Sequence, residues 1–271
     1  MMAAASAVVG LGVLAARDIT FGYPRRPVLR GVTAEFPRGV VTAVIGPNGA
    51  GKSTLLRLLM GVLRPSRGEV TKDGRGVRGI SATERARLMA YVPQHSQVAF
   101  PFSAAEVVRL GRFAAGSGGT DAFVGDALAR VGIADRADDL FGQLSAGQQQ
   151  RVTLARALAQ LRGHDGASYL VADEPVSAMD PHHALRAMEV LRDLAGAGCG
   201  VVVVLHDLSL VLRYAQRVVV LDASGQVAGA GAVHEVMTEE LLGRVYGVRF
   251  QRLVDPGAPE TPAAWVPAGP L

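Results

Sequence analysis

Cysteine and long apolar runs are both scarce in this 271-residue chain. The one cysteine excludes an internal disulfide framework. No run reaches the roughly 18 consecutive apolar residues that a membrane-spanning helix needs. The mostly apolar segment 1–16 is short, rich in Ala and Gly, and lacks the positively charged start of a secretory signal. We therefore predict a soluble, cytoplasmic chain in which residues 1–13 form a poorly ordered leader or an extra edge strand.

Long blocks of one charge are also missing. The net charge of +4 comes from 28 basic and 24 acidic residues, with no block of five or six like charges. This charge is compatible with nucleic acid or an anionic membrane face as a partner, but the scattered arginines favour an ordinary solvated surface. A hydrophobic content of 49% can supply the core of one large domain or of two small ones.

What the sequence does contain is a glycine-rich loop at residues 46–54. The loop reads Gly-Pro-Asn-Gly-Ala-Gly-Lys-Ser-Thr and follows the mostly apolar run Val40–Ile45. It matches G-x-x-x-x-G-K-[ST] in the strand–loop–helix context that gives this pattern meaning. Its glycines permit close backbone approaches, so that N–H groups can converge on an anion at the positive end of the next helix. A structural glycine turn would not explain Lys-Ser-Thr, and the loop therefore predicts nucleotide binding, with Lys52 on the β- and γ-phosphates and Ser53 on Mg²⁺.

Strand and helix patterns alternate along much of the chain, which predicts an α/β fold with a largely parallel sheet covered on both faces. Helices at about 100–160 read as a helical insertion, and from Asp255 the chain is rich in Pro and Ala and reads as an irregular tail. Strands are predicted at Ile19–Tyr23, Val32–Phe36, Val40–Ile45, Gly68–Lys72, Leu88–Val92, Tyr169–Ala172, Val201–Leu205 and Arg217–Leu221, and helices at Ala104–Leu110, Ala122–Val131, Gly147–Leu161 and Pro181–Leu194.

A serine stands where the loop after residue 140 turns into a predicted helix. Ser145 is followed by the small residues Ala146 and Gly147, and a hydroxyl with several N–H groups at a helix start can surround an anion. Ser145 is equally a good residue for an ordinary N-cap. This segment alone leaves both interpretations open.

Two acidic residues follow the apolar strand predicted at 169–172. Ligand chemistry in open parallel sheets concentrates at the carboxyl ends of the strands. Asp173 is therefore placed to orient Mg²⁺, directly or through water, and Glu174 to polarise a water for in-line attack on the γ-phosphate. A solvated acidic turn is the alternative. His206 ends the next apolar run, and we expect it at the same sheet edge as Lys52 and Glu174, within reach of a γ-phosphate oxygen.

The set of motifs resembles the nucleotide-binding subunit of an ABC transporter over about Leu14–Arg252. This resemblance implies a P-loop NTPase fold with a mainly parallel core sheet, an antiparallel β subdomain and a helical insertion, here within a domain at 14–252, followed by the tail 253–271. Residues 46–54 resemble the Walker A loop, Gln94 the Q-loop, Leu144–Gln148 the signature motif, Asp173 and Glu174 the end of Walker B, Ser177–Asp180 the D-loop, His206 the switch histidine and Tyr23 the aromatic residue that stacks on adenine.

The resemblance also implies ATP and Mg²⁺ as cofactors and a role for each matched residue. Family members act as head-to-tail dimers in which each ATP lies between one subunit's Walker A loop and the other's signature motif. The implied catalytic residues are Lys52, Gln94, Glu174 and His206, and the implied Mg²⁺ ligands are Ser53, Gln94 and Asp173. The implied nucleotide-binding residues are Tyr23, Gly46, Pro47, Asn48, Gly49, Ala50, Gly51, Lys52, Ser53, Thr54, Ser145, Ala146, Gly147, Gln148 and Asp180.

Two residues depart from the family pattern. Ala146 stands where the signature motif usually has Gly, although Ser145 and Gly147 remain. Met179 replaces the usual Leu in Ser-Ala-Leu-Asp, which is a conservative change. Neither departure removes a residue that hydrolysis needs.

A narrower resemblance, to the ATP-binding subunits of bacterial haemin importers, lies in Tyr91–Phe102, Glu106–Arg112, Leu154–Leu161 and Glu239–Gly247. It implies a homodimer at the cytoplasmic face of the membrane, an integral membrane permease dimer and a periplasmic or lipoprotein substrate-binding protein. Ferric-siderophore and cobalamin importers are the alternatives. The neighbours His182 and His183 do not favour a metal site, because successive helical side chains point about 100° apart.

A soluble ABC-type ATPase acting on nucleic acid or ribosomes is the hypothesis from another class. Such proteins usually carry two cassettes or a long coiled-coil insertion, and this sequence shows neither. An exporter subunit is less favoured because no membrane segment is fused to the chain. We therefore expect no nucleic-acid partner.

Overall fold

The computed structural model describes residues 12–24, 26–96, 98, 100–113, 120–163, 168–255 and 258–270. The leader predicted at 1–13 therefore lies almost entirely outside the described residues. Among the residues that are described, no helix is both long enough and apolar enough to cross a membrane.

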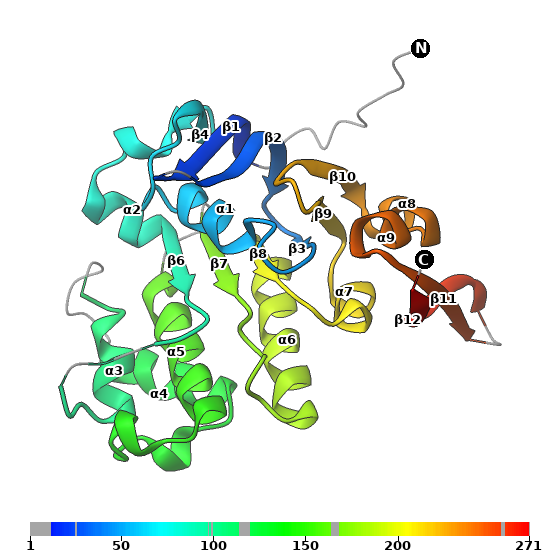
Figure 1. Cartoon of the computed structure of the whole chain (residues 1–271). Coiled ribbons are helices and arrows are strands. Elements are labelled where there is room, and N and C mark those ends of the chain that lie inside the picture. The colour runs from blue at the N-terminus through cyan, green and yellow to red at the C-terminus, as the bar shows by residue number, and fades with distance from the viewer. Residues whose placement is uncertain are drawn as a thin grey trace.

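A six-stranded sheet in the order β10-β9-β3-β8-β7-β6 forms the centre of the molecule (Figure 1). Its strands are parallel except for β10, which pairs antiparallel with β9. Every residue of β3, β7 and β8 is buried. The mostly apolar sequences of these strands predict this, because such runs are typical of strands covered on both faces. The bounds are β3 Val41–Ile45, β6 Met89–Val92, β7 Tyr169–Asp173, β8 Gly200–Val204, β9 Arg217–Leu221 and β10 Val227–Ala232.

A second, antiparallel sheet packs above the central one in the order β2-β1-β4-β5 (Figure 1). Leu14, Ile19 and Phe36 of this sheet are fully buried in one core cluster with leucines of α1 and one face of the central sheet. Asp73 and Gly74 form the turn between β4 and β5, with φ of 52° and 79°. The bounds are β1 Val13–Tyr23, β2 Arg26–Pro37, β4 Arg67–Lys72 and β5 Arg75–Gly76.

Helices α3, α4 and α5 lie together below the end of the central sheet at which β6 and β7 terminate (Figure 1). They share the second large core cluster, in which Val107, Leu128 and Val152 are almost fully buried. The P-loop NTPase fold predicted from the sequence is thereby confirmed. The helices are α1 Lys52–Leu59, α2 Ala82–Leu88, α3 Ala104–Leu110, α4 Thr120–Arg130, α5 Ala146–Leu161, α6 Pro181–Gly196, α7 Leu208–Tyr214, α8 Val233–Val236 and α9 Glu239–Tyr246.

The prediction of an irregular C-terminal tail was wrong. Strand β11 (Val248–Asp255) pairs antiparallel with β12 (Ala258–Pro270), and Trp265 of β12 is buried. The prolines of β12 resemble strand breakers in the sequence, but both strands of a two-stranded ribbon are edge strands, where a missing N–H is tolerated. The hairpin lies beside α7 and α9, and Phe250 and Trp265 join the core cluster there.

Candidate nucleotide-binding and catalytic site

The predicted site residues follow the carboxyl ends of neighbouring strands. Gly46 follows β3, His206 comes shortly after β8, Asp173 ends β7, and Gln94 comes shortly after β6. Because β3, β8, β7 and β6 are neighbours in the sheet, these residues share one edge of it.

The loop at 46–54 depends on glycine for its shape. Gly46 and Gly51 have φ of 146° and 95°, and a Cβ on Gly46 would lie 2.2 Å from the carbonyl oxygen of Leu221. The backbone N–H of Gly46 donates to the hydroxyl of Tyr246 at 3.1 Å, so that the last helix, α9, fixes the start of the loop. Tyr246 belongs to the segment Glu239–Gly247, and no local signal in the sequence points to this contact across 200 positions.

Lys52 is the first residue of α1 and is buried against the loop that precedes it. Its Nζ donates to the carbonyl oxygens of Gly46 and Pro47 at 2.8 and 3.0 Å. Burial lowers the pKa of Lys52, and the carboxylates of Glu174 and Asp173 oppose that shift. The ammonium group therefore lies where a phosphate can replace loop carbonyls as its partner.

A cavity of about 240 Å³ opens above this loop. Tyr23 lies at its edge with 41% of its surface exposed, as a residue that stacks on a base requires. Arg26 and Val28 also line the cavity, although no sequence signal beyond their place next to Tyr23 could have identified them. The lining residues are Tyr23, Arg26, Val28, Asn48, Gly49, Gly51, Lys52, Ser53, Thr54 and Glu174.

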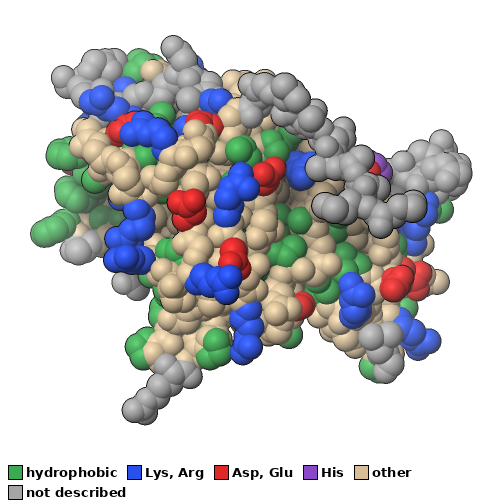
Figure 2. All heavy atoms as spheres, turned by 90° about the horizontal axis from the view of Figure 1, so that it is seen from above, with side chains coloured by type: hydrophobic (Ala, Val, Ile, Leu, Met, Phe, Trp, Pro, Cys, Tyr) green, Lys and Arg blue, Asp and Glu red, His purple; other side chains and the backbone are tan. Residues whose placement is uncertain are grey.

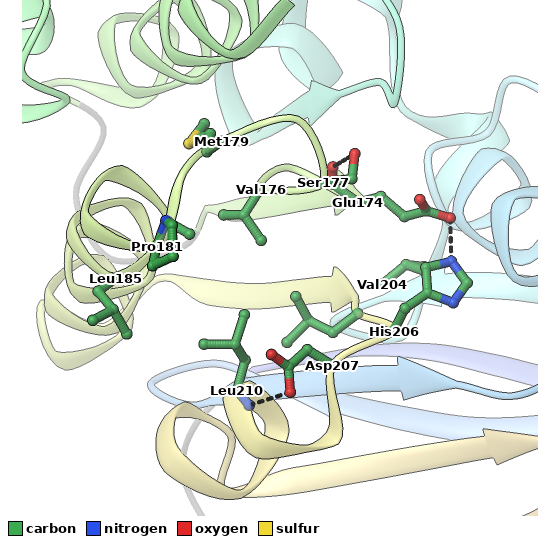
Figure 3. Close-up of a pocket in the computed structure, with 12 residues that line it drawn as sticks. Glu174, Val176, Ser177, Met179, Pro181, Leu185, Val204, His206, Asp207 and Leu210 are labelled. Atoms are coloured by element: carbon green, nitrogen blue, oxygen red, sulfur yellow. Dashed lines mark hydrogen bonds and ion pairs between the residues drawn. The ribbon is translucent and has the colours of Figure 1, made fainter.

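Glu174 connects the other predicted catalytic residues. Its Oε2 accepts from the Nε2 of Gln94 at 2.8 Å, and its Oε1 lies 2.5 Å from the Nε2 of His206. Figure 3 shows this contact between Glu174 and His206 at the edge of a second cavity of about 470 Å³, which extends toward α6 and α7. Glu174 has φ of 49°, in the left-handed region that non-glycine residues seldom adopt.

Asp173 is buried beside the loop with one unpartnered oxygen. Its side chain is 2% exposed, and Oδ1 has no hydrogen-bond partner among the described residues. Burial raises the pKa of Asp173, while the hydroxyl of Ser53 acts to lower it. A buried carboxylate oxygen without a partner, next to a serine hydroxyl, fits the all-oxygen coordination that Mg²⁺ prefers.

The signature residues lie apart from this cavity. Ser145 caps α5 by accepting from the N–H of Gln148 at 3.3 Å, and the side chain of Gln148 accepts from the N–H of Ser145 at 2.8 Å. Ser145 and Ala146 are exposed, and neither they nor Gly147 and Gln148 line the cavity above Lys52. The structure thus shows the N-cap role of Ser145 within one chain.

Asp180 is likewise a helix cap. Its side chain accepts from the N–H of His183 at 3.0 Å and lies 2.7 Å from the His183 ring, and these contacts hold the pKa of Asp180 below its ordinary value. Asp180 does not line the cavity above Lys52. Across the described parts of the chain, no group of three or more His, Cys, Asp or Glu side chains is arranged to hold a metal ion.

A glycine-rich phosphate loop at the carboxyl edge of a parallel sheet, with two acidic residues at the end of β7 at the same edge, defines a P-loop nucleotide-binding protein. Residues 29–177 match the family described as ABC transporter. The chain therefore belongs to the ABC transporter family.

Three relatives illustrate the similarity. The chain is 42% identical to the hemin import ATP-binding protein HmuV of Ruegeria sp. (strain TM1040), over 86% of this chain and 90% of that one. It is 38% identical to the protein of the same name in Rhizobium meliloti (strain 1021), over 90% and 95% of the two chains. A solved ATP-binding subunit of an ABC transporter superimposes with a TM-score of 0.73 at 26% identity, over 88% of this chain and 94% of that one.

Proposed function

We propose that this chain is the ATP-hydrolysing subunit of an ABC importer and energises haemin uptake through a separate membrane permease. The observation that carries the ATPase assignment is the Glu174 carboxylate, held between Gln94 and His206 and lining the cavity above Lys52. Haemin as cargo is supported by relatives that carry hemin import in their names, at 42% and 38% identity.

Binding of ATP uses the buried loop and the exposed aromatic ring. The adenine stacks on Tyr23, and the Nζ of Lys52 exchanges its hydrogen bonds to the carbonyls of Gly46 and Pro47 for hydrogen bonds to the β- and γ-phosphates. Asp173, Ser53 and Gln94 are the residues that would hold Mg²⁺, which supplies positive charge to the β- and γ-phosphates when it is bound.

Hydrolysis uses the residues that meet at the edge of the sheet. Glu174 accepts the proton of the water that attacks the γ-phosphate, and Gln94 holds the carboxylate in place. His206 moves between Glu174 and a γ-phosphate oxygen as the phosphate enters and leaves. The contact between His206 and Glu174 at 2.5 Å supports this exchange, because the imidazole already lies beside the catalytic carboxylate.

A second copy of the chain completes the site. The exposed Ser145 at the start of α5 offers a hydroxyl hydrogen and a helix N-terminus that do not line the cavity of its own chain. A head-to-tail homodimer brings these groups onto the γ-phosphate of the partner, and the dimer docks at the cytoplasmic face of a permease dimer that receives cargo from a substrate-binding protein.

Nucleic acid is a less suitable partner. On the face shown in Figure 2, basic side chains are interspersed with acidic ones and do not form one continuous basic patch. Arginines of the antiparallel sheet are also paired with acids, as in Arg67 with Asp18 at 2.9 Å. A phosphate backbone requires clustered and unpaired cations.

Transport by the reconstituted complex tests the proposal. We expect vesicles that contain this subunit and its permease to accumulate haemin only with ATP, and Glu174→Gln vesicles to accumulate none. A matched series with a ferric siderophore and with cobalamin identifies the cargo. Stimulation of ATP hydrolysis by either of these and not by haemin would contradict the haemin assignment, and stimulation by RNA or DNA without a permease would contradict the transport assignment.

A further inference from the structure

Gln150 lies on α5, the helix that begins at the signature residues and is called the signature helix below, and it holds the backbone of Glu174. The Nε2 of Gln150 donates to the carbonyl oxygen of Glu174 at 3.2 Å and to the hydroxyl of Ser177 at 3.0 Å. Its Oε1 accepts from the N–H of Ala178 at 3.0 Å. Gln150 is 8% exposed, and we refer to these three hydrogen bonds as the Gln150 clasp.

The clasp acts where the backbone is in an uncommon conformation. Glu174 has φ of 49°, and its carbonyl oxygen also accepts from the hydroxyl and the N–H of Ser177 at 3.2 and 3.3 Å. A left-handed non-glycine residue persists only where its surroundings hold it. Without the Gln150 clasp, the Glu174 peptide loses one of the groups that fix this conformation and the direction of its side chain.

Close packing accompanies the clasp one turn earlier on α5. Gly147 lies on the same helix face as Gln150, and a Cβ on Gly147 would lie 2.5 Å from the carbonyl oxygen of Ala178. The start of α5 therefore contacts the D-loop backbone directly, and the two elements cannot slide past each other without breaking these contacts.

We propose that Gln150 is a positioning residue that aims the Glu174 carboxylate, and that it links the signature helix to the catalytic glutamate of the same chain. The inference rests on the proposed ATPase function. In a head-to-tail dimer the signature residues of one chain and its Glu174 serve different ATP molecules. The Gln150 clasp then transmits the engagement of one ATP to the chemistry at the other.

A matched control lies on the same helix. Gln160 is also partly buried, and its Nε2 also donates to two main-chain carbonyls, those of Ala86 and Met89 at 2.7 and 3.1 Å. These hydrogen bonds join it to α2 and β6, and none of the hydrogen bonds found among the described residues joins it to the 174–180 loop. Gln150→Glu and Gln160→Glu each replace a donating amide by a carboxylate that faces carbonyl oxygens, and so they differ mainly in what the side chain holds.

Steady-state kinetics test the positioning role. We expect Gln150→Glu to lower kcat by about tenfold or more, because a small misplacement of a reacting group has an effect of that size. KM for ATP and the affinity for a fluorescent ATP analogue stay within about twofold, since Lys52 and the loop are untouched. We expect Gln160→Glu to keep kcat within about twofold of wild type, even if it lowers the midpoint of thermal unfolding as much as Gln150→Glu does.

A second background separates positioning from general damage. In Glu174→Gln the carboxylate is already gone, and adding Gln150→Glu is expected to leave the residual turnover unchanged. If Gln150→Glu lowered kcat by the same factor in the wild-type and Glu174→Gln backgrounds, the proposal would be overturned. Should Gln150→Glu fold poorly, Ser177→Ala removes an acceptor of the Gln150 clasp from an exposed loop and is expected to lower kcat by about threefold with KM unchanged.

The outcomes distinguish this inference from the proposed function. If the wild-type chain does not hydrolyse ATP, the proposed function fails. If wild type hydrolyses ATP and Glu174→Gln does not, but the kcat of Gln150→Glu matches that of Gln160→Glu, then the role of Gln150 alone is refuted.

Discussion

The two motifs expected to enclose ATP differ in how much of their surroundings one chain provides. Lys52 and Asp173 are 6% and 2% exposed, and the start of the loop that contains Lys52 packs closely against Leu221 and donates to the Tyr246 hydroxyl. Ser145 and Ala146 are exposed at the free start of α5, where the polar groups are satisfied by the helix's own capping box. One chain provides all the surroundings of the phosphate loop. The signature residues, by contrast, do not line the nucleotide cavity of their own chain.

This difference separates affinity from turnover. A buried loop with its cation in place can bind nucleotide without help, whereas catalysis that needs the signature residues has to wait for a second copy. Variants on the two sides should therefore have different effects, and the following tests are ordered from the largest expected effect to the smallest.

Glu174→Gln is expected to have the largest effect, on the phosphate-loop side. It removes the general base and should lower turnover by roughly 100-fold or more, the usual contribution of such a group. The variant should still bind nucleotide, and in the presence of ATP it should accumulate as a dimer, which size-exclusion chromatography detects. Glu189→Gln, an exposed carboxylate on α6, is the matched control and should behave as wild type. Near-normal turnover in Glu174→Gln would assign the base elsewhere.

Ser145→Asp probes the signature side with helix capping preserved, because Asp caps a helix about as well as Ser. Its negative charge should repel the partner's γ-phosphate and lower kcat/KM by about tenfold or more. Binding of nucleotide to the monomer should be unchanged. Ser103→Asp, at the other serine capping box, is the control with no expected effect on hydrolysis.

Mixing these two impaired variants sharpens the comparison. A heterodimer of Glu174→Gln and Ser145→Asp chains contains one site with both changes and one with neither. Random pairing makes half of the dimers heterodimers, so we expect the mixture to recover roughly a quarter of wild-type activity. A mixture as inactive as its components would show that each chain works with its own signature residues.

Asp173→Asn measures what the buried side contributes to stability. The pKa of Asp173 is raised in the folded state, so its ionisation destabilises the fold at pH above the unfolded-state value of about 4. We expect Asp173→Asn to stabilise the nucleotide-free protein at pH 7 by on the order of 1 kcal/mol, a gain typical of replacing a functional group. Chemical denaturation at pH 7 and at pH 4 should show the gain shrinking as the pH falls.

Asp222→Asn is expected to change the free energy of unfolding in the opposite direction. Burial acts to raise the pKa of Asp222, but hydrogen bonds from Ser224, Gln226 and Gly225 outweigh it and hold the pKa below its ordinary value. Ionisation of Asp222 therefore stabilises the fold, and the substitution should destabilise it at pH 7. Equal effects of the two variants would mean that burial does not set the behaviour of Asp173.

Much of the core sheet could be predicted because its signals are local. The runs that became β3, β7 and β8 are mostly apolar, and the residues at and just after their ends carry the chemistry. The role of Gln150 could not be predicted, because its partners lie 24 to 28 residues away and their approach depends on how α5 packs. Its only local sign was its position one turn after Gly147.

The C-terminal hairpin shows the opposite failure. Local composition was informative and pointed the wrong way, since the prolines of β12 argue against a strand. Pairing with β11 and burial of Trp265 against the core outweigh that preference. Tertiary contacts therefore decided the structure at this end of the chain.

The hydrogen bond between Gly46 and Tyr246 also has a consequence for the order of events during synthesis of the chain. The two residues are 200 positions apart, and β8 and β9, which flank β3, begin at residue 200 and at residue 217. At a ribosomal speed of about 5–20 residues per second, roughly 10–40 s separate synthesis of the loop from synthesis of its last contact. The emerging polypeptide thus contains the complete phosphate-loop sequence before β8, β9 and Tyr246 have been synthesised, and the loop can form its contact with Tyr246 only after residue 246 has emerged.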